Sequence, residues 1–145
     1  MNRPGVFLLS SLIAVACGPA DPGLEIVSVE LPNEIAIGGS AEFVMTTINV
    51  SDDPVVVESR RHEMMSLYVT DSDGSLIWHS FPDVSAAVLA RQVVIPPGQS
   101  DSWTEEWPLV DSEGAPVAPG VYFVSGRLGE EPKAESGRKR INVVP

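Results

Sequence analysis

Few side chains in this sequence of 145 residues could carry out acid–base or nucleophilic chemistry. His62 and His79 are the only histidines, and both lie in or beside segments that we expect to be strands, where a histidine is typically a surface or packing residue. The G-x-S-x-G, H-E-x-x-H and glycine-rich phosphate-binding motifs are all absent from the sequence. The sequence therefore predicts a protein that is not an enzyme and that holds no cofactor.

One segment resembles a metal-binding loop. In Asp71-Ser72-Asp73-Gly74-Ser75 the two carboxylates occupy alternate positions, as they do at the start of a calcium-binding loop. The closing glutamate of such a loop is missing, because a strand-like segment occupies the place where it would fall. An Asp-Gly hairpin turn explains the segment more simply, so we predict no metal site.

The single cysteine lies at a position where it could be modified. Residues 6–16 form an uncharged apolar run of eleven residues, which as a helix would cover about half of a ~30 Å bilayer core. Ala14-Val15-Ala16 then provides the small residues of a cleavage site, directly before Cys17. The segment AVAC also resembles a bacterial lipobox, although Ala14 stands where leucine is usual.

Two kinds of processing agree with this pattern. Ordinary signal peptidase would cleave after Ala16 and leave a free thiol, whereas the lipoprotein pathway would lipidate Cys17 before the same cut. We favour lipidation, because the only cysteine stands where lipidation requires it. The sequence thus predicts a signal peptide over residues 1–16 and a lipid attachment and tether over residues 17–23. It predicts export and lipid anchoring to the bacterial cell envelope, with a secreted or periplasmic protein as the alternative.

The charge excludes one class of partner and is unevenly distributed. With 9 Lys and Arg against 20 Asp and Glu, the formal charge is −11, which argues against nucleic-acid binding. Residues 92–126 contain acidic side chains and no basic ones, whereas five of the nine basic residues fall between Arg127 and Arg140. We expect solvated strand faces with opposite charges opposed across a sheet, and the alternative is an acidic patch that recruits a basic partner.

Patterning and composition together predict an all-β fold. Thirteen prolines and twelve glycines suit a protein of many turns, and no stretch of twelve residues free of both carries a helical period. Strand-like segments recur at roughly ten-residue spacing: 24–31, 41–50, 55–58, 65–70, 76–80, 87–95, 100–107, 121–128 and 139–144. We therefore predict an immunoglobulin-like antiparallel β-sandwich of 8–9 strands over residues 24–145, with no long helix.

Two of these segments allow finer predictions. Residues 99–107 alternate most clearly, and Trp103 and Trp107 share one face of the strand. Residues 24–31 keep no single phase, because the apolar side chains change sides at Ile26 and Val27. That change indicates a β-bulge, or alternatively a strand that is buried on both faces.

Four motifs in order resemble the BsuPI intracellular proteinase inhibitor family. The first is a strand that ends at Asn49, followed by a turn and a strand that begins with proline, and the second is a hairpin that ends in Trp78. The third is a Pro-Gly turn before a strand that ends in Trp107, and the fourth is a Pro-Gly-Val-Tyr segment that contains Tyr122. The motifs occupy residues 43–55, 67–78, 95–107 and 114–122, and the resemblance spans residues 43–128.

The resemblance implies roles for particular residues. As structural residues it marks Trp78, Pro97, Gly98, Trp107, Gly120 and Tyr122. The glycines suit turns and the aromatic rings would fill the core between the sheets.

The family's activity implies binding to a serine proteinase of the subtilisin type through an exposed loop. The longest such loop is predicted over residues 79–86, where Phe81 or Val84 could fill a subsite and Pro82 could stiffen the chain. We include His79 at its start. The alternative for this segment is a plain crossover between sheets.

The last hairpin also resembles a second group of proteins. The segment from Trp107 to Phe123 is similar to the final hairpin of immunoglobulin-like modules of the flagellar hook cap and of secretion systems. That similarity implies the alternative function, a non-inhibitory binding or assembly module of the cell envelope.

Overall fold

The computed structural model describes residues 23–59, 63–80, 91–129, 131 and 133–145. All regular secondary structure in these residues is β-strand, and none of them forms a helix long and apolar enough to cross a membrane. Cys17 and the predicted signal peptide lie outside the described residues. The strands are β1 (Leu24–Glu30), β2 (Glu34–Ala36), β3 (Ala41–Asn49), β4 (Val55–Ser59), β5 (Met65–Asp71), β6 (Leu76–His79), β7 (Arg91–Ile95), β8 (Ser100–Trp107), β9 (Gly120–Leu128), β10 (Ala134–Glu135) and β11 (Lys139–Val144).

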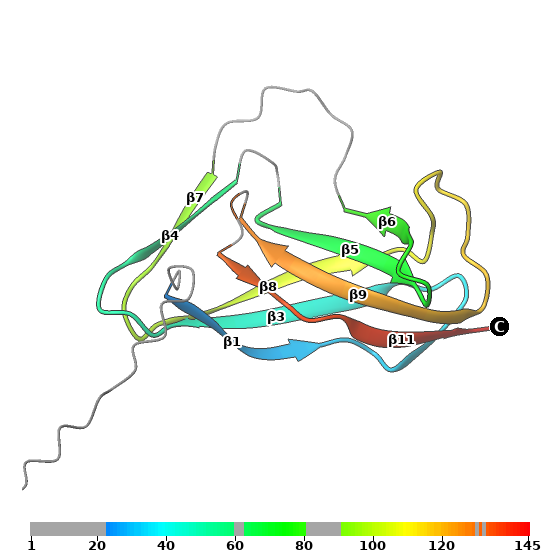
Figure 1. The fold of residues 1–145 in the computed structure, drawn as a ribbon, viewed down its shortest axis with the longest axis horizontal. Helices are drawn as coiled ribbons and strands as arrows, with labels where there is room; N and C mark the ends of the chain where they lie inside the picture. The colour runs from blue at the N-terminus through cyan, green and yellow to red at the C-terminus, as the bar shows by residue number, and fades with distance from the viewer. Residues whose placement is uncertain (1–22, 60–62, 81–90, 130, 132) are drawn as a thin grey trace, which may run out of the picture.

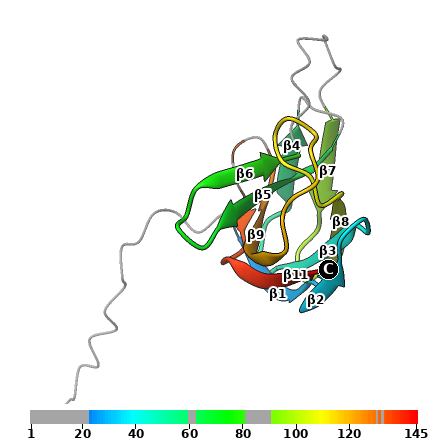
Figure 2. The same ribbon diagram turned by 90° about the vertical axis from the view of Figure 1, so that its right-hand side faces the viewer.

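Two sheets face one another as a sandwich (Figures 1 and 2). Sheet A has the strand order β1-β3-β8, and sheet B has the order β2-β11-β9-β5-β6, with β10 paired to β9. All pairs are antiparallel except β2 with β11, which is parallel. The prediction of an all-β, immunoglobulin-like sandwich is confirmed. The short strands β2 and β10 were not predicted, because segments of this length show no alternation.

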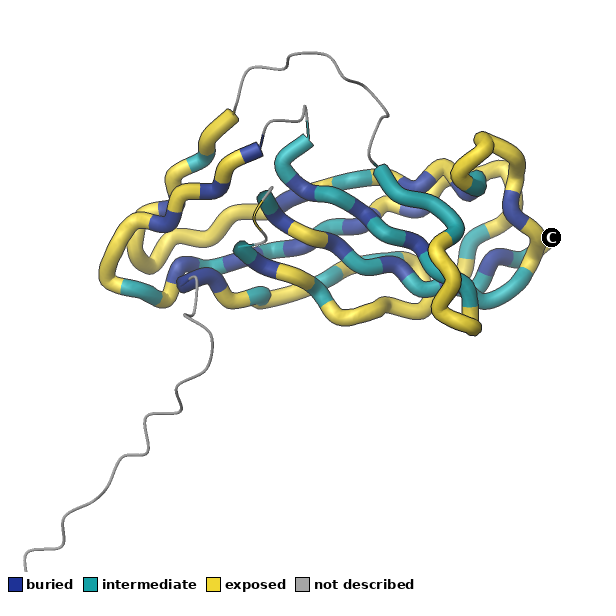
Figure 3. The backbone as a smooth tube through the Cα atoms, turned by 45° about the horizontal axis from the view of Figure 1, so that its top comes forward, coloured by how far each residue is buried: buried dark blue, intermediate teal, exposed yellow. Residues whose placement is uncertain are grey.

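The core lies between the two sheets and follows the alternation of the long strands (Figure 3). In β3, Ala41, Phe43 and Met45 point inward, and across the register Ala41 faces Trp107 and Met45 faces Trp103. The two tryptophans therefore share the buried face of β8, as the alternation predicts. Strand β5 of sheet B contributes Met65, Leu67 and Val69 to the core, and all three are buried.

The first strand contains the bulge that its sequence indicates. The register of β1 on β3 shifts between Ile26 and Ser28, which leaves Val27 as the extra residue. The extra residue allows Ile26 and Val29 to pack against the core despite their odd spacing. Val27 itself is 61% exposed.

A long arch carries the chain from β8 in sheet A to β9 in sheet B, and two aromatic rings support it. Trp107 is fully buried and donates from Nε1 to the backbone oxygen of Val110 at 2.9 Å. The ring of Tyr122 meets Trp107 edge to face at 5.4 Å, and its hydroxyl donates to the backbone oxygen of Ala118 at 2.7 Å. A tyrosine bonded back to the preceding connection is a feature of immunoglobulin-like crossovers. Burial, and then the nearby Asp71 carboxylate, raise the pKa of Tyr122, so the phenol keeps its proton for this bond.

The three motif aromatics are buried to different degrees. Trp107 is inaccessible and Tyr122 is buried, whereas Trp78 is only partly buried. The reason is position, since Trp78 lies on β6, at the edge of sheet B, where a ring can be covered from one side only. Trp78 still packs against the core from that edge.

Replacing Trp107 should therefore destabilise the domain more than replacing Trp78. We expect Trp107→Ala to lower the free energy of unfolding by about 3–5 kcal/mol, because it removes a buried ring and its hydrogen bond. Trp78→Ala should cost less than half as much. Chemical denaturation of residues 18–145, with midpoints compared at equal slope, measures both. Equal losses for the two variants would contradict the burial described here.

Candidate functional site

The predicted proteinase-contact loop leaves the sandwich from β6. His79, its first residue, lies opposite Tyr68 of β5 and is partly buried. The next residue, Ser80, extends the β5–β6 ladder: its backbone N–H donates to the Leu67 oxygen at 3.0 Å, and its Oγ accepts the Leu67 N–H at 2.8 Å. The root of the loop on this side is thus fixed by two hydrogen bonds. Phe81, Pro82 and Val84 lie outside the described residues.

On the other side the chain returns at Arg91, the start of a two-stranded ribbon formed by β4 and β7. In Figure 1 this ribbon rises from the left-hand ends of β3 and β8. The inner face of the ribbon packs against the core, since Val57 and Ile95 are buried there. On its outer face, Val56 and Val94 form an exposed pair. The ribbon is therefore a fixed extension of the sandwich.

The ribbon continues the β3–β8 pair around a corner, and Asn49 occupies that corner. The last pair of β3 and β8 is Ile48 with Ser100, and the first pair of β4 and β7 is Val55 with Ile95. Between these pairs, residues 50–54 on one strand and residues 96–99 on the other lie outside the ladder. Both strands turn at this place, so the backbone N–H and C=O groups of both turns need hydrogen-bond partners that the ladder does not supply.

Asn49 supplies those bonds with every polar atom that it has. Its backbone N–H donates to the Gln99 oxygen at 2.9 Å, and its backbone oxygen accepts the Gly98 N–H at 2.8 Å. Its side-chain Nδ2 donates to the backbone oxygens of Asp53 and Ile95, both at 2.8 Å. Its Oδ1 accepts the N–H and the hydroxyl of Ser51 at 2.9 and 2.7 Å. The residue is fully buried, so these bonds form away from water.

The Pro97-Gly98 motif forms the matching half of the corner. Gly98 has φ +74°, a conformation that other residues adopt at a cost, and its N–H is the donor to Asn49. The space around its Cα is open, so the requirement for glycine lies in the backbone and not in packing. The motif residues Asn49 and Gly98 thus act together across the two strands.

A cavity of about 360 Å³ lies in the angle between β7, the edge strand β8 and the start of β5. Apolar side chains from three elements line it, namely Met64, Met65, Val93 and Trp103, beside the charged residues Glu63, Arg91 and Glu105. The indole Nε1 of Trp103 is already engaged, since it donates to Thr47 Oγ1 at 3.1 Å. The cavity therefore has a lining of mixed polarity, in which the apolar side chains could contact a hydrophobic side chain of a partner. The sequence did not predict it, because the corner that creates it is non-local.

The calcium-like segment is a turn, and the chain contains the same turn twice. Asp71 and Asp111 each accept, through Oδ1, the backbone N–H groups two and four residues further along, at 2.9–3.0 Å. Gly74 and Gly114 each complete the turn with φ near +80°. The described residues contain no group of three His, Cys, Asp or Glu side chains that could hold a metal ion. The repeated D-S-x-G pattern is visible in the sequence.

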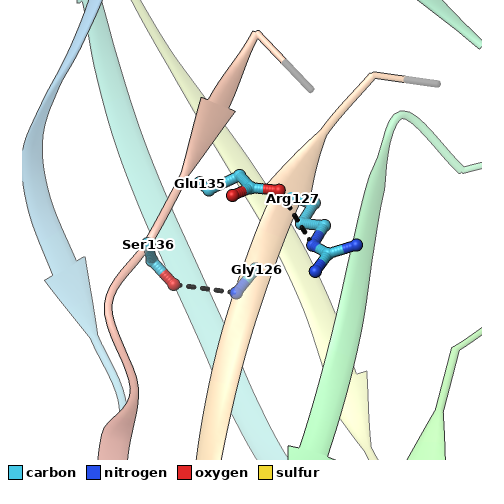
Figure 4. A network of polar contacts seen from close by, with 4 residues as sticks. All are labelled: Gly126, Arg127, Glu135 and Ser136. Atoms are coloured by element: carbon cyan, nitrogen blue, oxygen red, sulfur yellow. Dashed lines mark hydrogen bonds and ion pairs between the residues drawn. The ribbon is translucent and has the colours of Figure 1, made fainter. Parts of the chain in front are cut away.

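Basic residues gather on the outer face of sheet B. Arg127 forms an ion pair with Glu135 across β9 and β10, with Nε 2.9 Å from Oε1 (Figure 4). Beside it, Ser136 Oγ accepts the Gly126 N–H at 2.8 Å, which fastens the segment after β10 to β9. This ion pair places opposite charges across two strands of sheet B, whereas Glu42 and Glu106 place like charges across two strands of sheet A.

Comparison with known proteins identifies a fold and no family. No protein-family model matches the sequence, and a comparison with curated proteins finds no match either. Among solved structures, an alkylpurine DNA glycosylase from Pseudomonas fluorescens matches over 85% of this chain with a TM-score of 0.54 and 13% identity. A β-glucosidase from Erythrobacter marinus matches over 83% with a TM-score of 0.52 and 15% identity. A β-glucosidase from Listeria innocua gives a TM-score of 0.49 at 19% identity over 84% of the chain.

These similarities are to one part of much larger proteins. The chain spans 31% of the glycosylase, 15% of the Erythrobacter enzyme and 16% of the Listeria enzyme. At such low identity the glycosylase and the Erythrobacter enzyme show a shared fold alone, and they carry no information about activity.

The corner provides a direct test of the site's architecture. Asn49→Asp keeps the shape of the side chain but replaces the Nδ2 donor with an oxygen that faces two carbonyl oxygens. We expect it to lower the free energy of unfolding by about 2–4 kcal/mol, because buried acceptors are left unbonded. Amide exchange should accelerate at Val57 in the ribbon before it does at Leu67 in the sandwich.

Asn33→Asp is the matched control, since Asn33 is exposed and should change stability by less than about 0.5 kcal/mol. Urea denaturation of residues 18–145 measures both variants. If Asn49→Asp unfolds at the same midpoint as Asn33→Asp, the corner does not depend on this amide.

Proposed function

We propose that the mature chain is a lipid-anchored proteinase inhibitor of the BsuPI type, a non-catalytic domain of the bacterial cell envelope. It acts by binding a serine proteinase of the subtilisin type. The observation that carries the proposal is that residues shared with the family, Asn49 and Gly98 above all, hold the corner that fixes the ribbon. The described residues on either side of the segment that contains the predicted contact loop, residues 79–86, are held in place at Ser80 and at Arg91.

Fixed roots matter because an inhibitory segment must meet a proteinase cleft in an extended conformation without a large loss of entropy. The sandwich supplies this rigidity without a disulfide. The cavity beside β7 adds apolar side chains next to the root at Arg91, where a partner's side chain could be held. Neither feature calls for a catalytic group or a cofactor.

Processing of the leader is the first test. In a bacterial host the chain should be cut before Cys17, carry lipid and partition into detergent. Cys17→Ala should abolish lipidation, as measured by metabolic labelling with a fatty acid and by mass spectrometry of the mature protein. Release of the wild-type protein in soluble, unlipidated form would contradict the proposed anchor.

Inhibition is the second test, and it can use residues 18–145, which contain every strand and core residue that the structure describes. We expect reversible inhibition of a subtilisin-like proteinase at about one to one, followed with a small chromogenic substrate. The double variant Phe81→Ala, Val84→Ala should weaken inhibition by roughly tenfold or more, because a few anchoring side chains carry most of the affinity.

The matched control is Val56→Ala, Val94→Ala, which shortens two exposed side chains on the outer face of the ribbon and should leave inhibition unchanged. Electrophoresis after the assay shows that the inhibitor is intact and is not merely a competing substrate. Absence of inhibition by folded protein at ~100 μM, where even a weak complex is populated, would contradict the proposed activity. Inhibition that survives the loop substitutions would instead assign the contact to another surface.

A further inference from the structure

The outer face of sheet A is acidic. Its register turns alternate residues of β1, β3 and β8 to solvent, and four of them are glutamates: Glu25, Glu30, Glu42 and Glu106. None of the residues that these three strands turn outward is Lys, Arg or His.

Two of these glutamates are directly opposed. Glu42 of β3 pairs with Glu106 of β8, and like charges in that position destabilise a sheet. The hydroxyl of Ser40 donates to Glu106, but no cation among the described residues lies against either carboxylate. A cation supplied from outside would relieve this repulsion.

The outer face of sheet B is basic and aromatic. Arg127 lies over the ring of Tyr68 and Arg138 over the ring of Phe123, each with its guanidinium carbon 4.4 Å from the ring centroid. Arg140 is directly opposite Phe123 in the β11–β9 register. Exposed arginines stacked on aromatic rings are typical of the residues that carry binding energy at protein interfaces.

These arginines are held in place and are only partly neutralised. Arg138 also donates to Thr70 Oγ1 at 3.2 Å and to the Asp71 backbone oxygen at 3.3 Å, so little side-chain entropy is lost when it binds a partner. Glu135 neutralises Arg127, whereas Arg138 and Arg140 form no ion pair with a described carboxylate. The charge of Arg138 is therefore available to a carboxylate from outside, and Arg140 is available beside Glu34, with which it lines a surface pocket.

The two faces lie on opposite sides of the sandwich and cannot meet within one molecule. Packed sheets are ~10 Å apart, and at physiological salt charges beyond about 8 Å of water are largely screened from one another. The electrostatic interactions of each face are therefore limited to groups in contact with it, and the net charge of −11 has little effect on them. The nearest surface of the right chemistry is on another copy of the chain.

We propose that the outer face of sheet B in one copy docks on the outer face of sheet A in a second copy. Arg138 and Arg140 of one molecule then lie against Glu42 and Glu106 of the next. The contact is heterologous, so it leaves one free face on each end and the chains associate head to tail. This inference does not depend on proteinase inhibition, and it would suit an assembly module of the envelope.

The association should be weak in solution. Two arginines and two glutamates carry the contact, and exposed ion pairs of this kind each contribute little. Attachment of many copies to one membrane would raise their effective concentration and favour the contact. That last point rests on the proposed lipid anchor, whereas the contact itself does not.

Sedimentation velocity of residues 18–145 at ~0.15 M salt tests the proposal. We expect the average sedimentation coefficient to rise with protein concentration, and to return to the monomer value at ~1 M salt, where the screening length falls to about 3 Å. The acid-face variant Glu42→Lys, Glu106→Lys and the basic-face variant Arg138→Glu, Arg140→Glu should each remain monomeric alone. Mixing the two variants should restore association, because the intact basic face of one meets the intact acidic face of the other and the two reversed faces are also opposite in charge.

Controls separate the proposed contact from general charge effects and from misfolding. The variant Asp52→Lys, Glu113→Lys changes the net charge by as much as the acid-face variant does, but at exposed residues that lie on neither face. It should associate like the wild type. Arg140→Glu alone leaves the bonds of Arg138 intact and should still weaken association several-fold. Near-ultraviolet circular dichroism shows that each variant is folded.

Three results would overturn the proposal. One is a wild type that remains monomeric up to ~1 mM. Another is an acid-face variant that associates as well as the wild type. That result would point to a general charge effect, because the loss of negative charge promotes non-specific association. The third is a mixture of the two folded variants that remains monomeric.

Discussion

Strands β3 and β8 turn away from their sheet side by side, and the side-chain amide of Asn49 forms hydrogen bonds to both sides of the corner that results. A buried amide with four hydrogen bonds is stabilising only while all of its partners are in place, because a buried donor or acceptor without a partner costs more than the bond contributes. The direction of the β4–β7 ribbon, the cavity beside β7 and the position of Arg91 all follow from this corner. An apolar residue at position 49 could fill the space but could not hold either turn.

The arch from β8 to β9 is held by aromatic rings, whereas the corner is held by an amide. Trp107 and Tyr122 pack edge to face and each bonds one backbone oxygen of the arch between them. Leu109, buried within this arch, has φ +56°, a strained conformation for a branched side chain. The burial of its side chain offsets that strain. The corner and the arch together show how two connections of a sandwich without a disulfide are held in place.

Much of this architecture could be predicted from the sequence, because alternation and turn chemistry are local properties. The buried face of β8, the bulge at Val27 and the Asp-Gly turn at Gly74 were all predicted correctly. The parallel pairing of β2 with β11 was not, since it joins segments far apart in the chain and β2 is too short to show a period.

The site was less accessible to such reasoning. The sequence shows that Asn49 ends a strand, but not that its amide reaches Ile95 across a non-local corner. It shows clusters of acidic and basic residues, but not which of them share a face, because the face depends on the register. Arg127 meets Tyr68 and Arg138 meets Phe123 only after β5, β9 and the segment before β11 lie side by side.

The bulged first strand has a mechanical consequence. Strand β1 follows directly on Gly23, whose backbone oxygen accepts the Val50 N–H at 2.9 Å, and it runs along β3 away from the end where the chain enters. The C-terminus lies at the opposite end of the sandwich (Figure 1). Tension between the two ends therefore acts along β1, across hydrogen bonds that stand perpendicular to the strand, so they bear the load together and not one after another. The bulge divides this ladder into two segments, one on each side of Val27.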